Sequence, residues 1–256
     1  MYNGNNRGFS AEDSYEEYAL LARKFRLDEN LSEEESHFFS NLVELYGIKS
    51  LLDCGCGSGK HLFFFDRLGI RASGCDISPS MLELSRDFLK RKQSSIMVEN
   101  CDFRLLGRVY SSRFDCVICI SSLSHLENTV EVSRALSSMR DRISQGGILI
   151  LELPAENLGK SMRDRIRLEY SDGNFTRTVA YHPFENHTEM SVLDVLHYPA
   201  ERPFYRYDFR LLRIGEADLK ELLLKNGFLK MTSFGDYDMS KYLPGESEKL
   251  IVVAER

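Results

Sequence analysis

The sequence lacks the two apolar features that direct a chain to or through a membrane. No stretch approaches the roughly 20 apolar residues that a helix needs to cross a bilayer. The opening segment, MYNGNNRGFSAEDSYEEY, is polar and acidic and has no apolar core of a secretory signal. We therefore expect a cytoplasmic protein without a membrane partner.

An excess of positive charge is also missing, and so is the cysteine density of a secreted domain. With 33 Lys and Arg against 39 Asp and Glu, the net charge of −6 offers no general attraction for nucleic acid. The six cysteines lie within or beside apolar runs of the N-terminal half, unlike a compact disulfide framework. Cys116 and Cys119 are three residues apart in an expected strand, so their side chains should point to opposite faces. We interpret the cysteines as buried free thiols.

The chain contains a regular alternation of expected strands and helices. Residues 11–46 have helix-like apolar spacing that is interrupted near residues 30–32, where Ser32 and Glu35 have the spacing of a capping box. Strands are expected at 50–54, 71–76, 95–100, 114–120 and 146–154, and helices at 60–68, 78–92 and 129–143. Such alternation predicts a parallel sheet with helices on both faces and a ligand at the carboxyl ends of the strands.

The character of the sequence changes after Pro154. Three stretches rich in Arg, Tyr and His (174–182, 188–198 and 204–214) are expected to form a small antiparallel β insert. A helix at 216–228 and two closing strands at 228–235 and 249–255 follow. We predict an α/β fold with a doubly wound, Rossmann-like, seven-stranded sheet whose last strand is antiparallel. Its parts are an N-terminal helical cover (1–46), the sheet domain (47–158 and 214–256) and the insert (159–213). We expect the insert to form a lid or a dimer contact, and the protein to be a monomer or a homodimer.

The segment LLDCGCGSGKH (51–61) carries the most chemical information. A buried strand ends at Asp53, and Gly55, Gly57 and Gly59 follow before a helix begins. Glycine is needed where the backbone has a positive φ or passes close to a ligand. A dinucleotide loop reads G-x-G-x-x-G, which differs from the G-x-G-x-G found here. A phosphate loop needs Ser or Thr after its lysine, and His61 stands there instead.

The pattern D-x-G-x-G-x-G at the end of a first strand resembles the cofactor loop of class I S-adenosylmethionine-dependent methyltransferases. The resemblance covers about residues 35–155 and 215–256. It implies that Asp76, which ends the second strand, holds the ribose hydroxyls of the cofactor, with Ile77 and Met81 beside it. It also implies that Asp102 and Phe103 lie against the adenine. The same resemblance implies that Ile120 lies beside the methionine part of the cofactor.

Two N-terminal tyrosines resemble those that cover the cofactor in small-molecule methyltransferases, although packing of the helix is an equal alternative. In full, the cofactor-binding residues that the resemblance implies are Asp53, Cys54, Gly55, Cys56, Gly57, Gly59, Asp76, Ile77, Met81, Cys101, Asp102, Phe103, Ile120, Tyr15 and Tyr18.

Methyl transfer from a sulfonium requires an acceptor held in line with the methyl group, and neither a metal nor a covalent nucleophile is needed. A general base is required only if the acceptor must lose a proton. His125, just after the fourth strand, is the candidate base, and a structural histidine is the alternative. The histidines of the insert show no convincing metal-ligand spacing. Its residues Arg177, Tyr181, Tyr205, Arg206, Tyr207 and Arg210 either recognise an acidic acceptor or form a solvated strand face.

The predicted function is transfer of a methyl group from S-adenosylmethionine to N or O of a small molecule, which leaves S-adenosylhomocysteine. An RNA or protein methyltransferase is the alternative among enzymes, but the acidic balance disfavours nucleic acid. No Asn/Asp-Pro-Pro-aromatic run, typical of base-modifying enzymes, follows the fourth strand. A non-catalytic module that binds the cofactor and regulates another process stays open, whereas the glycine spacing disfavours a nicotinamide dehydrogenase.

Overall fold

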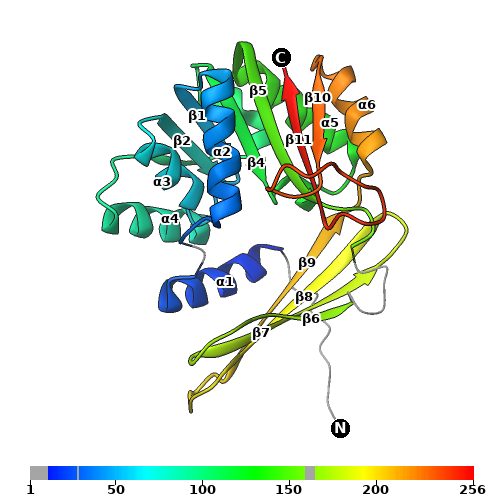
Figure 1. Ribbon diagram of the computed structural model, residues 1–256. Coiled ribbons are helices and arrows are strands. Elements are labelled where there is room, and N and C mark those ends of the chain that lie inside the picture. The colour runs from blue at the N-terminus through cyan, green and yellow to red at the C-terminus, as the bar shows by residue number, and fades with distance from the viewer. Residues whose placement is uncertain (1–10, 28, 159–164) are drawn as a thin grey trace.

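The computed structural model describes residues 11–27, 29–158 and 165–256, which form two sheets and their covering helices (Figure 1). Residues 1–10 and 159–164, which belong to the predicted cover and insert, lie outside the described residues. The helices are α1 (Ala11–Phe25), α2 (Glu33–Tyr46), α3 (Lys60–Arg67), α4 (Pro79–Arg91), α5 (Thr129–Arg142) and α6 (Glu216–Lys225), with 3₁₀ turns η1 (Phe103–Arg108) and η2 (Leu123–His125).

The larger sheet has seven strands in the order β10-β11-β5-β4-β1-β2-β3. They are β1 (Ser50–Cys54), β2 (Arg71–Asp76), β3 (Val98–Asn100), β4 (Phe114–Ile120), β5 (Ile143–Pro154), β10 (Met231–Phe234) and β11 (Lys249–Glu255). Strand β11 is antiparallel to both of its neighbours, which confirms the predicted Rossmann-like sheet with an antiparallel last strand. The strand order reverses between β1 and β4, and a ligand site is expected at their carboxyl ends.

Both faces of the larger sheet are covered, as the nearly continuous apolar strands require. Helices α5 and α6 contribute buried side chains such as Leu136 and Leu219 to one core. Helices α2 and α3 contribute Phe39 and Phe65 to the other. Cys116 and Cys119 are both fully buried, and they lie in opposite cores. Their separation across β4 is the geometry expected for two strand residues three positions apart.

Local signals place the helix ends where the sequence predicts them. The Ser32 side chain accepts from Glu35 N, and the Glu35 side chain accepts from Ser32 N, so a capping box begins α2. Gly47 ends that helix in the left-handed conformation. Ser78 caps α4, whose first residue is Pro79. These caps fix the direction in which α4 leaves the end of β2.

The insert has four antiparallel strands, and the prediction of three was wrong. They are β6 (Ile166–Ser171), β7 (Phe175–Pro183), β8 (His187–Leu196) and β9 (Phe204–Leu212), in that spatial order. Strand β6 is an edge strand with little burial, and its register on β7 shifts between Leu168 and Tyr170. Its sequence, IRLEYS, alternates apolar and polar residues, so the strand period was a signal that the prediction did not use. Within the described part of the chain, no helix has the length and apolarity needed to cross a membrane.

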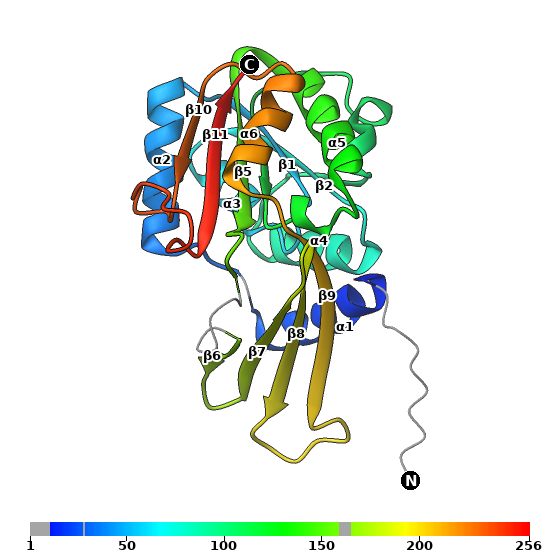
Figure 2. The ribbon, with the colours of Figure 1, turned by 90° about the vertical axis from the view of Figure 1, so that its right-hand side faces the viewer.

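Helix α1 connects the two layers (Figure 2). On one side, Arg23 forms ion pairs of 3.4 Å with Glu83 and 3.3 Å with Asp87, both on α4. On the other side, Ser14 Oγ donates to the Asp208 carbonyl of β9 at 2.8 Å. The Asp208 N–H donates back to the same hydroxyl at 3.1 Å. The helix therefore closes the space between the insert and the carboxyl ends of the larger sheet.

Candidate functional site

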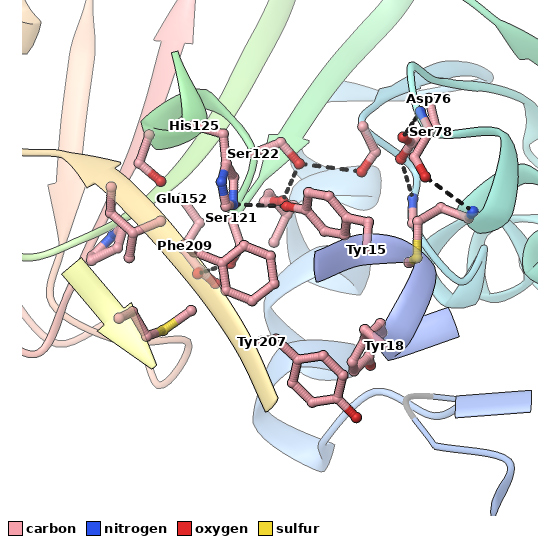
Figure 3. A pocket seen from close by; sticks show the side chains of 18 of the residues that line it. Tyr15, Tyr18, Asp76, Ser78, Ser121, Ser122, His125, Glu152, Tyr207 and Phe209 are labelled. Atoms are coloured by element: carbon pink, nitrogen blue, oxygen red, sulfur yellow. Dashed lines mark hydrogen bonds between the residues drawn. The ribbon is translucent and has the colours of Figure 1, made fainter. Parts of the chain in front are cut away.

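A cavity of about 890 Å³ lies between the carboxyl ends of the central strands, α1 and the inner face of the insert (Figure 3). Its size is at the upper end of the range of small-molecule sites, which is about 300–1,000 Å³. It is lined at one end by the glycine loop and at the other by β7, β8 and β9. Such a volume can hold two small molecules side by side.

The structure brings most of the predicted cofactor residues to this cavity. Its wall includes eleven of them, namely Tyr15, Tyr18, Gly55, Cys56, Gly57, Asp76, Ile77, Met81, Asp102, Phe103 and Ile120. The candidate base His125 lies there too. Asp53, Cys54, Gly59 and Cys101 do not line it; the side chains of Cys54 and Cys101 are buried in the core beneath the strand ends.

The loop between β1 and α3 has a backbone that only glycine adopts easily. Gly55 has φ +78°, and a Cβ on it would lie 2.4 Å from Ser122 Oγ. The N–H groups of Gly55 and Cys56 donate to the Cys75 carbonyl at 2.8 and 2.9 Å, which fixes the loop to β2. Helix α3 then begins at Gly59 without a side-chain cap. Its first N–H groups and the positive end of its dipole can hold a carboxylate.

Asp76 is held in place by backbone N–H groups. Its carboxylate accepts from Gly57 N at 3.0 Å and from Ser78 N at 2.9 Å. Burial raises its pKa, and the hydrogen bonds from Ser78 and Gly57 oppose that rise. Each oxygen keeps a second lone pair, so the carboxylate can still accept from two neighbouring hydroxyls of a ligand.

Asp53 lies beneath the glycine loop with 1% of its surface exposed. Its Oδ2 atom has no hydrogen-bond partner in the described structure. Burial raises the pKa of this carboxyl to about 6, and the neighbouring His61 and Lys60 oppose the rise. Nearby, His61 Nε2 lies 2.8 Å from Glu35 Oε1. A buried polar atom without a partner costs free energy, which a bound donor would recover.

Asp102 already has a partner within the chain. Its two oxygens accept from Arg104 Nε at 3.0 and 2.9 Å, and its Oδ2 accepts from Arg104 Nη2 at 2.7 Å. Burial opposes ionisation of this carboxyl, but the hydrogen bonds from Arg104 lower its pKa overall. The same arginine pairs with Glu131 at 2.7 Å. The carboxylate at this strand end is therefore oriented before any ligand arrives.

Tyr15 and His125 meet above the cavity (Figure 3). The Tyr15 hydroxyl and His125 Nε2 are hydrogen-bonded at 2.8 Å. Phe209 of β9 packs on both rings, with centroid distances of 5.1 and 5.6 Å. Burial lowers the pKa of His125 to about 4, whereas burial and the charge of Asp76 raise that of Tyr15. At neutral pH both groups are uncharged, so the histidine is a weak base in this arrangement.

The insert contributes a wall with a buried ion pair. Arg177 donates through Nε and Nη2 to the two oxygens of Asp194, each at 2.8 Å, and the Tyr207 hydroxyl donates to Asp194 Oδ2 at 3.0 Å. Arg177 also lies 5.5 Å from the ring centre of Tyr18. Tyr181 lines the cavity as well, but Tyr205, Arg206 and Arg210 do not. Among the residues that the structure describes, no group of three His, Cys, Asp or Glu could hold a metal ion.

Glu152 lines the cavity and was not predicted, and it lies beside Ser121. Ser121 has φ +53°, a strained conformation that is common at functional sites. Its Oγ donates to Glu152 Oε1 at 2.6 Å. Glu152 stands at the end of buried strand β5, so the signal that indicated Asp53 and Asp76, an acid ending an apolar strand, could have indicated it too.

Comparison with known proteins connects this geometry to an activity. Residues 51–147 match the family model described as a methyltransferase domain. A similar curated protein is the glycine/sarcosine N-methyltransferase of Parasynechococcus marenigrum, 26% identical over 207 residues that cover 80% of this chain and 72% of that protein. Another is the dTDP-3-amino-3,4,6-trideoxy-alpha-D-glucopyranose N,N-dimethyltransferase of Streptomyces venezuelae, 33% identical over 105 residues, 40% of this chain and 41% of that protein. The alignment with the glycine/sarcosine N-methyltransferase of Aphanothece halophytica covers only 46% of that relative.

Solved structures share the fold over nearly the whole chain. A S-adenosylmethionine-dependent methyltransferase from Clostridium acetobutylicum superposes with a TM-score of 0.75 at 16% identity, covering 94% of this chain and 98% of that one. Streptomyces venezuelae DesVI superposes with a TM-score of 0.70 at 19% identity, covering 96% and 98%. Because these coverages exceed residues 51–147, the shared fold includes elements on both sides of the matched domain.

Proposed function

We propose that the chain, whose residues 51–147 match a methyltransferase domain, methylates a nitrogen atom of a small molecule. S-adenosylmethionine is the methyl donor in this proposal. The observation that carries it is the position of the glycine loop, Asp76 and Asp102 at three adjacent strand ends around one cavity. The relatives named for glycine, sarcosine and an amino sugar favour nitrogen over oxygen as the methylated atom.

The residues present fit such a donor. Asp76 would accept the ribose hydroxyls, and Phe103 and Met81 would pack on the nucleoside. The uncapped N-terminus of α3 would hold the carboxylate of the methionine part. When bound, the sulfonium supplies an electrophilic methyl group. The four predicted residues that do not line the cavity act, in this proposal, by shaping the backbone and the charge beneath it.

The remaining walls would orient the acceptor. Tyr15 closes the cavity from α1, and His125 fixes its hydroxyl. Because a pKa of about 4 makes His125 a weak base, we propose that it acts by orienting Tyr15 and that the acceptor loses its proton to water. Correct orientation of two bound reactants supplies roughly 7–11 kcal/mol of barrier reduction, which is sufficient without a strong base.

The insert is proposed to have a second role as a homodimer contact. Its outer face carries apolar side chains on adjacent strands, including Leu168, Leu193, Val195 and Phe204, each at least 39% exposed. Leu168 and Leu193 share Thr178 as a cross-strand neighbour, so they lie in one row. An exposed apolar sheet face of this kind is typical of a protein interface.

The proposal is tested by calorimetry and by turnover. Wild-type protein should bind S-adenosylmethionine saturably and should transfer labelled methyl groups to a panel of amines that includes glycine, sarcosine and amino sugars. Asp76→Ala should weaken cofactor binding at least about 10-fold, because a charged acceptor of hydrogen bonds is lost. Absence of cofactor binding by the wild type would refute the proposal. Binding without turnover on any acceptor would instead favour a regulatory module.

A further inference from the structure

Glu152 is a buried carboxylate that faces the cavity without a positively charged partner. Only 9% of its surface is exposed. Its oxygens accept from two neutral hydroxyls, from Ser121 Oγ at 2.6 Å and from Tyr237 at 2.5 Å. In the described part of the chain no Lys, Arg or His lies within ion-pair distance of it. Buried carboxylates are normally paired, because the desolvation of an isolated charge is costly.

Three cations that line the cavity already have acidic partners. Arg177 is paired with Asp194 at 2.8 Å. Arg167 is paired with Glu248 at 2.9 Å. Lys249 is paired with Asp236 at 3.1 Å and lies over the ring of Tyr237. Glu152 is therefore a buried carboxylate without an ion-pair partner among the described residues, and a cationic ligand group would pair with it.

The position of Glu152 separates it from the residues proposed for the nucleoside. It stands opposite Ile120 in the β4–β5 register, at the neighbouring strand end. Figure 3 places it beside Ser121, on the side of His125 and Phe209 and away from Asp76. Ser122, the next residue, contacts Gly55 of the glycine loop through a hydrogen bond of 3.3 Å. The carboxylate thus lies at the boundary between the glycine loop and the insert wall, where an acceptor would meet a methyl donor.

Backbone strain is concentrated at the same point. Ser121 has φ +53°, and its N–H donates to the Glu152 carbonyl at 3.1 Å. The same residue donates its hydroxyl to the Glu152 side chain. A non-glycine residue in this conformation costs of order 1–3 kcal/mol and persists where the surroundings impose it. The strain holds one oxygen of the carboxylate in a fixed direction, and each oxygen keeps a further lone pair for a ligand.

From these observations we infer that Glu152 binds the amino group of the acceptor and selects cationic aliphatic amines over alcohols of the same shape. The inference rests on the proposed methyl transfer and names the acceptor class for it. The bound ammonium loses one proton to water, its nitrogen lone pair then forms the N–CH3 bond as the S–CH3 bond breaks, and a methylated ammonium and a neutral thioether result. Because the ammonium of the acceptor and that of the product are both positively charged, one carboxylate would hold both. An alcohol would leave the buried charge unmatched, and that mismatch is the source of the selectivity.

The test compares Glu152→Gln, which keeps the shape and removes the charge, with Glu152→Asp and with Glu44→Gln on the exposed surface of α2. Cofactor affinity is measured first by calorimetry with S-adenosylhomocysteine. Acceptor affinity is then measured on the loaded protein with two matched pairs, glycine against glycolate and glucosamine against glucose. Methyl transfer to both amines gives kcat and KM separately, and thermal unfolding confirms that each variant is folded.

We expect Glu152→Gln to weaken amine binding and to raise KM for amines about 10- to 100-fold, the effect of losing a charge-assisted hydrogen bond. Cofactor affinity should stay unchanged, Glu152→Asp should keep part of the amine affinity, and Glu44→Gln should match the wild type. A parallel loss of cofactor affinity would overturn the inference, since the carboxylate would then serve the donor. Equal binding of amines and alcohols by the wild type would overturn it too. Failure of the wild type to bind the cofactor would instead refute the proposed function.

Discussion

Asp53 is an ionisable residue in a fully buried location. The carboxyl is buried beneath the glycine loop, its pKa is raised to about 6, and one oxygen lacks a partner in the described structure. Ionisation at neutral pH therefore costs free energy in the folded state. Because the folded pKa exceeds the ordinary value of 3.8, this cost is absent in acid and is fully established above pH 6.

Asp53→Asn should consequently stabilise the ligand-free protein at pH 7 by about 2–3 kcal/mol, since one pKa unit corresponds to about 1.4 kcal/mol. The same change should weaken S-adenosylmethionine binding. Urea unfolding at pH 7 and calorimetry measure the two effects, and Asp141→Asn on the exposed end of α5 is the matched control. A variant that is less stable than the wild type at pH 7 would show that the buried charge has a partner that we have missed.

His125 should give stability the opposite dependence on pH. Its folded pKa of about 4 lies below the ordinary value of 6.5, so folding favours the neutral ring. The stability that the ring contributes is present above pH 6.5 and is lost as the pH falls toward 4. The loss attributable to this residue should reach about 3 kcal/mol.

His125→Gln keeps a hydrogen-bonding side chain near Tyr15 and removes the titration. Urea unfolding of the wild type and the variant should give stability curves that converge as the pH falls from 7 to 4.5. Parallel curves over that interval would mean that the ring does not titrate as its burial implies.

At the scale of elements, the loop between β1 and α3 combines a backbone requirement with a steric one. Gly55 and Gly69 have nearly the same positive φ, +78° and +76°. A Cβ at Gly55 would lie 2.4 Å from Ser122 Oγ, whereas a Cβ at Gly69 would meet nothing within 4 Å. Substitutions at Gly55 and Gly69 can therefore separate the free-energy cost of a positive φ from that of a steric clash.

Gly69→Ala should cost about 1 kcal/mol of stability, the usual penalty for a left-handed alanine, and should leave cofactor binding unchanged. Gly55→Ala should cost more than Gly69→Ala and should weaken cofactor binding at least about 10-fold, because Ser122 must move. Thermal unfolding and calorimetric titration with S-adenosylmethionine give both numbers. Equal effects of the two substitutions would contradict the steric argument.

The elements that the sequence predicted well are those specified by local signals. The capping box at Ser32, the cap at Ser78 and the apolar runs of β1 and β4 act within a few residues, so the sequence alone locates them. Strand β6 was missed although IRLEYS alternates between apolar and polar residues, so the sequence did contain a signal for it. Glu152 ends an apolar strand and could have been predicted to line the site, but its contacts with Ser121 and Tyr237, which are distant in the sequence, are visible only in the fold.

At the scale of the whole molecule, the exposed apolar face of the insert leads us to expect a homodimer. If it forms a homodimer contact, Leu193→Lys, at the centre of that face, should shift the protein from dimer to monomer in sedimentation velocity at micromolar concentration. Burial of a lysine charge in an apolar contact is unfavourable without a partner. Leu229→Lys, at a residue that is 72% exposed and lies after α6, is the control and should leave the assembly unchanged. A monomeric wild type would refute the dimer proposal.

Helix α1 is held to both of its neighbours by two kinds of interaction. On the α4 side, the exposed ion pairs of Arg23 lie beside a buried apolar cluster that includes Ala22 and Leu84. On the insert side, Glu17 pairs with Arg202 at 2.6 Å, and Tyr18 packs on Tyr207. Salt weakens exposed ion pairs and leaves apolar packing in place, so rising ionic strength should leave this wall of the cavity closed.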